Sequence, residues 1–274
     1  MKQSIILWLI AFAITVGSAV YQRVTGPTYP HSGRVVLGGS DIAYRLDRSH
    51  GGDGDHRVQI LAGKTNVEGI LEWKRYNSGV DWTAVRMTND NGMLTAELPW
   101  QPAAGKLMYR VSLRSGDSAV LIPSDEPVVI RFRGEVPWFI LIPHIAAMFG
   151  AMLFSARTGL EYFKPEPKYR GLVFWTIGFL LVGGMILGPL VQKYAFDAYW
   201  SGWPLGGDLT DNKTAVALIG WLGAAIALRR SRRPARWIVL AAIILFVVYL
   251  IPHSLLGSEL RYEEKHETGE ERRP

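Results

Sequence analysis

Five long apolar runs constrain this sequence most, because each lacks Asp, Glu, Lys and Arg and approaches the length that crosses a bilayer. A membrane-spanning helix needs roughly 17–25 mostly apolar residues. The runs lie at about residues 5–20, 136–156, 172–191, 214–228 and 237–251. We therefore expect a membrane α-helical bundle of about five spans, with the lipid bilayer as its surroundings.

Composition excludes several kinds of chemistry. The 274 residues include no cysteine, which excludes disulfides, thiolate-ligated iron–sulfur clusters, covalent c-type haem, a lipoprotein anchor and cysteine nucleophiles. The formal charge of +6 does not indicate nucleic acid, because the arginines cluster beside apolar runs. We therefore expect no nucleic-acid partner.

The basic residues of the short loops predict the orientation. Four lie in residues 156–171 and five in residues 229–236, whereas residues 192–213 contain only Lys193 and Lys213. Cytoplasmic loops carry the excess of Lys and Arg. We expect a bacterial inner-membrane protein with a cytoplasmic N-terminus, and with residues 24–135 and the C-terminal tail in the periplasm. The first run is either a retained anchor or a signal peptide cleaved near Gly17-Ser18-Ala19.

The block between the first two runs has the pattern of short strands separated by turns. About seven strands without a helical period are typical of a β-sandwich, and Tyr109-Arg110-Val111 resembles the penultimate strand of immunoglobulin-like domains. Asn91-Gly92 predicts a tight hairpin between the strands at residues 83–87 and 93–98. The clearest strand candidates are residues 58–61, 69–73, 83–87, 93–98, 107–113 and 128–133.

These patterns divide the chain into four parts. They are an N-terminal anchor (1–23), an extracytoplasmic immunoglobulin-like β-sandwich (24–135), a four-helix transmembrane bundle (136–256) and a polar tail (257–274). Within the spans, Gly184 and Gly188 favour close helix packing inside the bundle. Four tryptophans near span ends are expected as interfacial anchors: Trp138, Trp175, Trp221 and Trp237.

Residues 49–56 hold two histidines and two aspartates within eight positions. They could bind a metal, but the fixed ligand ladder of a calcium loop is missing. A plain solvent-exposed hairpin is the expectation that we favour.

Two histidines within or beside spans are the first candidates for a functional site. An ionisable residue inside a span is costly and often functional. Met148 and Met152 follow His144 at helical spacing, and His253 lies at the outer end of the fifth run. The two imidazoles could ligate b-type haem or bond a quinone, and His144 with the methionines could bind copper(I). Alternatively, each histidine bonds to a backbone carbonyl freed by its neighbouring proline or to the polar loop, so the cofactor stays unknown.

The second candidate is the polar loop that leads into the fourth run. Thr210 or Asp211 is placed to cap the helix that follows. Asp208, Asp211, Asn212 and Lys213 exceed what one cap requires. We expect a buried polar network that locks this loop beneath the β-domain as a docking surface or a lid.

Several motifs resemble a family of uncharacterised bacterial multi-spanning membrane proteins with an extracytoplasmic β-domain. They are Gly202-Trp203-Pro204-Leu205-Gly206-Gly207-Asp208-Leu209-Thr210-Asp211-Asn212-Lys213-Thr214, Ile251-Pro252-His253-Ser254 and Gly257-Ser258-Glu259. The resemblance implies a layout and no reaction.

The features together favour a non-enzymatic subunit or accessory protein of a larger membrane complex, such as one of respiratory or photosynthetic electron transfer. Its partners would be other membrane-protein subunits. The alternative is a haem-, quinone- or copper-binding redox protein that uses His144 and His253. No hydrolase motif occurs and no inverted repeat suggests a transporter. Whether the chain is an enzyme stays open, with the subunit preferred.

Overall fold

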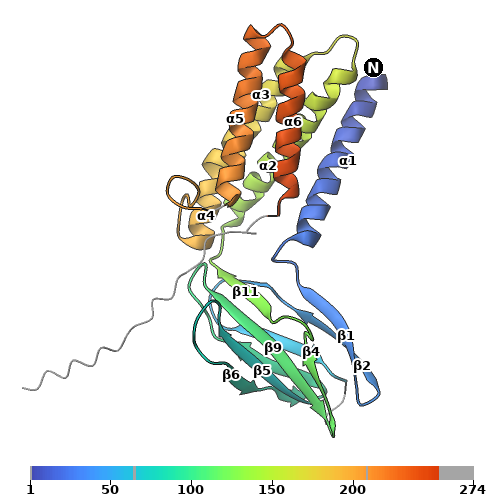
Figure 1. Cartoon of the computed structure of the whole chain (residues 1–274), viewed down its shortest axis with the longest axis vertical. Helices are drawn as coiled ribbons and strands as arrows, with labels where there is room; N and C mark the ends of the chain where they lie inside the picture. Colours follow the sequence, from blue (N-terminus) through green and yellow to red (C-terminus); the bar gives the residue numbers. More distant parts are fainter. Residues whose placement is uncertain (1, 64–65, 208, 253–274) are drawn as a thin grey trace, which may run out of the picture.

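The computed structural model describes residues 2–63, 66–207 and 209–252. Figure 1 shows a bundle of helices above a β-domain, with the chain passing between them at the ends of α1 and α2. The helical elements are α1 (Lys2–Thr25), α2 (Trp138–Leu160), the short η1 (Glu161–Phe163), α3 (Tyr169–Phe179), the π-helix η2 (Leu180–Leu187), α4 (Gly188–Phe196), α5 (Leu209–Arg230) and α6 (Pro234–Leu250).

Three helical segments are long and apolar enough to cross a membrane. They are α1, α2 with η1, and the continuous run α3–η2–α4, which cover Lys2–Thr25, Trp138–Phe163 and Tyr169–Phe196. The apolar α6 is shorter, with 17 residues. Among the described residues, three helices therefore confirm the expected membrane character of the chain.

The helical segments run in alternating directions around α2, which packs against α1, α3, η2 and α6 (Figure 1). Gln3 at the start of α1 donates to the Phe163 carbonyl, 3.3 Å away. Gln22 near the end of α1 donates to the Tyr249 carbonyl, 2.9 Å away. These two bonds lie at opposite ends of α1, with Gln22 at the end nearer the β-domain (Figure 1). At that end of the bundle α1, α4 and α6 finish, and α2 and α5 begin.

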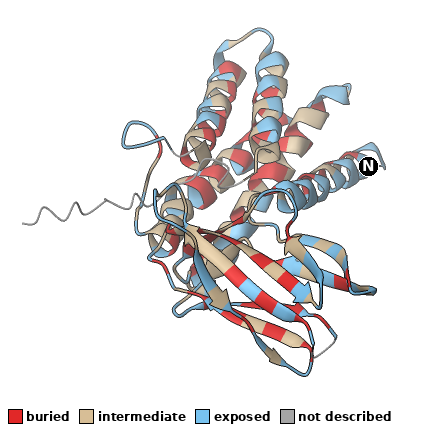
Figure 2. Cartoon of the chain, turned by 60° about the horizontal axis from the view of Figure 1, so that its bottom comes forward, coloured by how far each residue is buried: buried red, intermediate tan, exposed pale blue. Residues whose placement is uncertain are grey.

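The core of the bundle corrects one expectation. Trp221 is fully buried, with 0% of its surface exposed, so it is not an interfacial anchor. It lies in the middle of α5, because that helix begins at Leu209 and extends five residues before the expected span. The other three tryptophans are exposed, at 73% for Trp138 and 52% for both Trp175 and Trp237. Figure 2 shows that α1 is exposed along most of its length.

Two glycines of the third expected span lie where helices approach closely, namely Gly184 of the predicted pair and Gly183 beside it, whereas a methyl group on Gly188 would lie no closer than 3.8 Å to a neighbouring helix. A methyl group on Gly184 would lie 2.6 Å from the Thr214 Cγ2 of α5. One on Gly183 would lie 2.9 Å from the Ala147 Cβ of α2. These contacts are intramolecular, as expected for packing within the bundle.

The β-domain contains eleven strands among the described residues, more than the expected seven. The six predicted strands are present as β4, β5, β6, β8, β9 and β11. The tight Asn91-Gly92 turn, with φ of 49° and 87°, is also present, but it joins β7 to β8, whereas the predicted partner β6 pairs with β5 in another sheet. The strands are β1 (His31–Leu37), β2 (Ser40–Leu46), β3 (Ser49–Gly51), β4 (His56–Leu61), β5 (Glu68–Arg75), β6 (Thr83–Arg86), β7 (Thr88–Asp90), β8 (Met93–Leu98), β9 (Lys106–Ser115), β10 (Ser118–Ile122) and β11 (Val128–Arg133).

Three sheets share one hydrophobic core. The largest has the order β3-β11-β9-β5-β6 with β10 beside β9, a second has the order β4-β8-β7, and β1 pairs with β2. Along β9 the side chains alternate, and Leu107, Tyr109, Val111 and Leu113 are completely buried in that core. This alternation is what a strand with one buried face requires.

Residues 49–56 do not form the expected hairpin. The strand β3 pairs in parallel with β11, whereas β4 pairs antiparallel with β8 in a different sheet. The turn at residues 52–55 therefore carries the chain from one sheet to another. The pairing partners β11 and β8, which are distant in the sequence, decide this path. The local turn residues therefore could not predict it.

Direct contacts join the β-domain to the bundle. The Gly134 N–H donates to the Ala195 carbonyl of α4, with N and O 3.0 Å apart. The guanidinium of Arg131 on β11 stacks on the Phe196 ring, with Cζ 3.8 Å from the ring centroid. A methyl group on Gly134 would collide with the Tyr194 carbonyl, so only glycine allows this approach.

Candidate functional site

His144 lies on the second turn of α2 and contacts the backbone of η2. Its Nδ1 is 2.9 Å from the carbonyl oxygen of Gly183. Because a carbonyl oxygen only accepts hydrogen bonds, the neutral imidazole carries its proton on Nδ1 and donates it there. The second ring nitrogen, Nε2, is consequently left as a hydrogen-bond acceptor.

The π-helical form of η2 prepares the Gly183 carbonyl for this contact. The Gly188 N–H bonds to the same oxygen, five residues back, and the second lone pair accepts the imidazole proton. Pro189, in the first turn of α4, has no N–H with which to continue the normal ladder. The histidine therefore uses a carbonyl of a neighbouring helix, and not one freed by the adjacent Pro143.

A cavity of about 130 Å³ lies beside His144 at the β-domain end of the bundle. Met148 lines it from α2, Gln192 from α4 and Asp211 from α5. The volume is below the roughly 300–1,000 Å³ of typical small-molecule pockets.

The two methionines of the predicted site line different cavities. Met148 lines the cavity beside His144, whereas Met152 lines another, mainly apolar cavity together with Ile14 and Val239. Met152 is also nearly completely buried, at 1% exposure. His144 and Met152 are eight residues apart in α2, which places them about 12 Å apart along the helix axis, so a shared helix face does not bring them to one cavity.

Asp211 fastens the loop that precedes α5. Its Oδ2 accepts the backbone N–H of Ser201 at 2.7 Å and that of Gly202 at 3.0 Å. The Ser201 hydroxyl, 3.4 Å from the same oxygen, also accepts a hydrogen bond from the Gln192 amide at 2.5 Å. Asp211 is 9% exposed and lies in the first turn of α5, where the helix dipole favours a negative charge.

Asn212 completes the attachment of this loop. Its Oδ1 accepts the backbone N–H of Trp203, with the two atoms 2.7 Å apart. The loop side chains above these bonds are nevertheless open to their surroundings, since Trp203 and Leu205 are each 78% exposed. Hydrogen bonds from Asp211 and Asn212 therefore hold the backbone of a loop whose apolar side chains face outward.

Lys213 acts on a different segment. Its Nζ donates to the Ile251 carbonyl at 2.6 Å, and Gln22 of α1 donates to the same oxygen at 3.3 Å. These bonds satisfy a carbonyl just after the end of α6, where the helix offers no N–H of its own. Asp208 and His253, which were also predicted for the site, lie outside the described residues, as does the tail from residue 257.

The histidines of residues 49–56 form a pair in the β-domain. His50 Nε2 donates to the Gly54 carbonyl at 3.1 Å, so its Nδ1 accepts a hydrogen bond from the His56 Nδ1–H, with the two nitrogens 3.1 Å apart. Burial, and then the neighbouring His50, lower the pKa of His56. Among the described residues no group of three or more His, Asp or Glu side chains is placed to hold a metal ion, so the metal hypothesis for residues 49–56 gains no ligand set.

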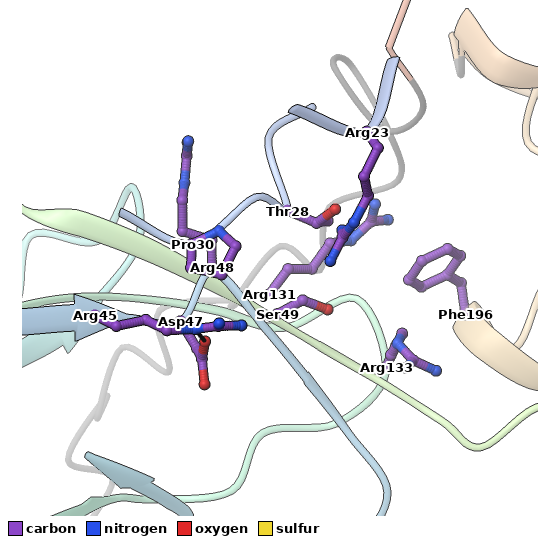
Figure 3. A pocket seen from close by; sticks show the side chains of 10 residues that line it. All are labelled: Arg23, Thr28, Pro30, Arg45, Asp47, Arg48, Ser49, Arg131, Arg133 and Phe196. Carbon is purple, nitrogen blue, oxygen red and sulfur yellow. Dashed lines mark hydrogen bonds and ion pairs between the residues drawn. The ribbon is translucent and has the colours of Figure 1, made fainter. Parts of the chain in front are cut away.

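A buried ion pair at the opposite end of the bundle was not predicted. Glu161 bonds Arg157 at 2.5 Å and Lys164 at 3.0 Å, and its Oε1 also accepts the Lys168 backbone N–H at 2.9 Å. Only 3% of the Arg157 side chain and 1% of the Glu161 side chain is exposed. The i,i+4 spacing of Arg157 and Glu161 was the available signal. A second group that the sequence did not reveal is a set of arginines where the β-domain meets the bundle (Figure 3).

No protein-family model matches the chain, and a search of curated proteins finds no match. The functional proposal below therefore rests on the geometry of the chain itself.

Proposed function

We propose that this chain is a non-enzymatic integral membrane subunit or accessory protein of a larger membrane complex. It would cross the bacterial inner membrane five times, with α5 and α6 as the fourth and fifth spans. Residues 24–135 would form an immunoglobulin-like sandwich in the periplasm, and the N-terminus would be cytoplasmic. Other membrane-protein subunits would dock on the β-domain and on the loop before α5.

The distribution of basic residues supports this orientation. The turn between α2 and α3 contains Lys164 and Lys168, and the turn between α5 and α6 contains Arg232 and Arg233. Both turns lie at the end of the bundle opposite the β-domain (Figure 1). Under the positive-inside rule, that end faces the cytoplasm.

The observation that carries the proposal is the fastened apolar loop. Trp203 and Leu205 are each 78% exposed, although Asp211 and Asn212 hold their backbone from beneath. Rigid, exposed apolar groups favour association, because little conformational entropy is lost when a partner covers them. Aromatic residues are also enriched at protein interfaces.

The geometry favours this scaffold role over the redox alternative. His144 already donates to the Gly183 carbonyl, and the cavity beside it, at about 130 Å³, is small for a haem or a quinone ring. A copper(I) site on His144 and Met148 would use the free Nε2. An absorption spectrum and metal analysis of the purified chain test this alternative, which a Soret band lost in His144→Ala would support.

The test of the subunit role is migration on a native gel after gentle extraction from its own membranes. The 30.6 kDa chain is expected to migrate in a larger, defined complex. Leu205→Ser should release it to the mass of the free chain. Phe163→Ser is the matched control, since Phe163 is 67% exposed in η1, at the end of the bundle opposite the β-domain and the loop before α5. A partner-free wild-type chain would refute the proposal.

A further inference from the structure

A cavity of about 400 Å³ lies between the β-domain and the helix ends. We call it the arginine pocket. Figure 3 shows Arg23 reaching down from the end of α1 and Phe196 facing the pocket from α4. The charged residues that line it are Arg23, Arg45, Arg48, Arg131, Arg133 and Asp47.

Strand geometry brings two of these arginines to one face. Arg131 and Arg133 alternate along β11 with Ile130 and Phe132, which lie in the core of the β-domain. In the parallel pairing with β3, Gly51 lies opposite Arg133. A methyl group on Gly51 would lie 2.9 Å from the Arg133 Cζ, so the missing side chain leaves space for this guanidinium.

The pocket is strongly positive. Its described lining holds five arginines and one aspartate, which is a formal charge of +5 − 1 = +4. Asp47 forms an ion pair with Arg45 at 3.5 Å, at side-chain exposures of 43% and 70%. The aspartate thus offsets one cation, and the field of the others is directed into a concave, partly enclosed space.

Arg131 forms a fixed part of the pocket. Only 8% of this residue is exposed, and its guanidinium lies flat enough on Phe196 to place Cζ 3.8 Å from the ring centroid. A stacked, partly desolvated guanidinium attracts an anion more strongly than one in open water. Because it also joins the two parts of the chain, Arg131 is unsuitable for a first binding test.

The mouth of the pocket lies beside the membrane-spanning segments. Arg23 is in the last turn of α1 and Phe196 is the last residue of α4, and both helices belong to candidate spans. Two helices that end at this level place the pocket at the lipid headgroups. Orientation is already explained by the basic turns at the opposite end, so these arginines need another explanation.

We propose that the arginine pocket binds a phosphate-ester anion, supplied by the headgroup of an anionic lipid in the adjacent leaflet. Guanidinium groups suit this chemistry, because their planar N–H donors bind phosphate oxygens in pairs. The volume of about 400 Å³ lies within the range of ligand pockets. The proposal is independent of whether a protein partner docks on the loop before α5.

The test is a lipid titration of the full chain in detergent, followed by native mass spectrometry. Dioleoyl phosphatidylglycerol is compared with dioleoyl phosphatidylcholine, which has the same tails and no net charge. Wild type should bind the anionic lipid preferentially. Arg23→Gln with Arg48→Gln should weaken that binding by roughly fivefold per arginine, or about 25-fold for the pair.

The matched control is Arg34→Gln with Arg114→Gln, which removes the same charge from exposed strand positions outside the pocket. It should change the affinity less than about twofold, since surface charge away from a site is largely screened. Circular dichroism checks that both double variants keep the wild-type fold. Equal binding of the two lipids, or equal losses in the two double variants, would overturn the proposal.

Competition with a soluble phosphate ester distinguishes the source of the phosphate. In the same assay, sn-glycerol 3-phosphate should compete only weakly with phosphatidylglycerol, because it lacks the adjacent acyl anchor. Tight binding of this soluble ester, lost in Arg23→Gln with Arg48→Gln, would overturn the lipid source and assign the pocket to a soluble phosphate ester.

Discussion

Replacing Asp211 by alanine should release the loop before α5. The substitution removes the oxygen that accepts the Ser201 and Gly202 N–H groups, at 2.7 and 3.0 Å. A buried donor left without a partner costs about 1–3 kcal/mol. With both donors affected and some water entering, we expect the local opening free energy to fall by about 2–3 kcal/mol.

The assay is hydrogen exchange of the full chain in nanodiscs, followed at the Ser201 and Gly202 amides. Since about 1.4 kcal/mol corresponds to a tenfold change, exchange should accelerate about 30- to 150-fold. Asp211→Asn keeps an acceptor oxygen and should show a smaller acceleration. Asp197→Asn is the control, because Asp197 is exposed and pairs with Lys193. Unchanged exchange in Asp211→Ala would refute the role assigned to this carboxylate.

Three further predictions concern the β-domain and its junction. Gly134→Ala places a methyl group against the Tyr194 carbonyl and should destabilise the junction by about 1–3 kcal/mol, measured as faster proteolysis there. Leu94→Ala empties a completely buried position and should cost about 2–5 kcal/mol, measured by urea unfolding of the β-domain signal. Burial and the nearby His50 lower the pKa of His56, so the unfolded chain binds a proton more readily. The contribution of His56 to the free energy of unfolding should therefore be fully present above about pH 6.5 and be lost as the pH falls below it. Unfolding midpoints measured across that pH range test this.

Matched variants keep these outcomes specific. Gly171→Ala enters open space and should leave the junction intact, and Leu61→Ala changes a side chain that is 61% exposed. If these two control variants lost as much stability as Gly134→Ala and Leu94→Ala, the packing explanation would be contradicted. His56→Gln should flatten the pH profile, and an unchanged acid slope in that variant would exclude His56 as its cause.

Local patterns in the sequence were sufficient for the helices and for part of the β-domain. Uncharged apolar runs of 15 to 21 residues form helices, because a helix satisfies its backbone within the segment, as a lipid environment demands. The Asn91-Gly92 turn was likewise predictable, since both residues tolerate the positive φ that such a turn requires. The five further strands, including β3 and β10, lacked a local signal strong enough to identify them.

The sequence suggested only part of the candidate site: Met152 lines a different cavity from His144, and Asp208 and His253 lie outside the described residues. Asp211 and Asn212 do hold the loop, as a polar network was expected to do. His144, however, bonds to Gly183, and this pairing depends on a π-helix formed 39 residues later in the chain. Spacing along one helix could not show which neighbour would present a carbonyl.

The sequence by itself therefore determined which segments form apolar helices, three of them long and apolar enough to cross a membrane, and where the polar block lies between them. Only the tertiary structure decided which faces meet: Trp221 is in the core, residues 49–56 cross between sheets, and arginines from four segments form one pocket. The physical reason is the distance along the chain over which each kind of interaction acts. Helix formation and tight turns depend on neighbours within a few residues, whereas packing and strand register depend on partners brought together only when the whole chain folds.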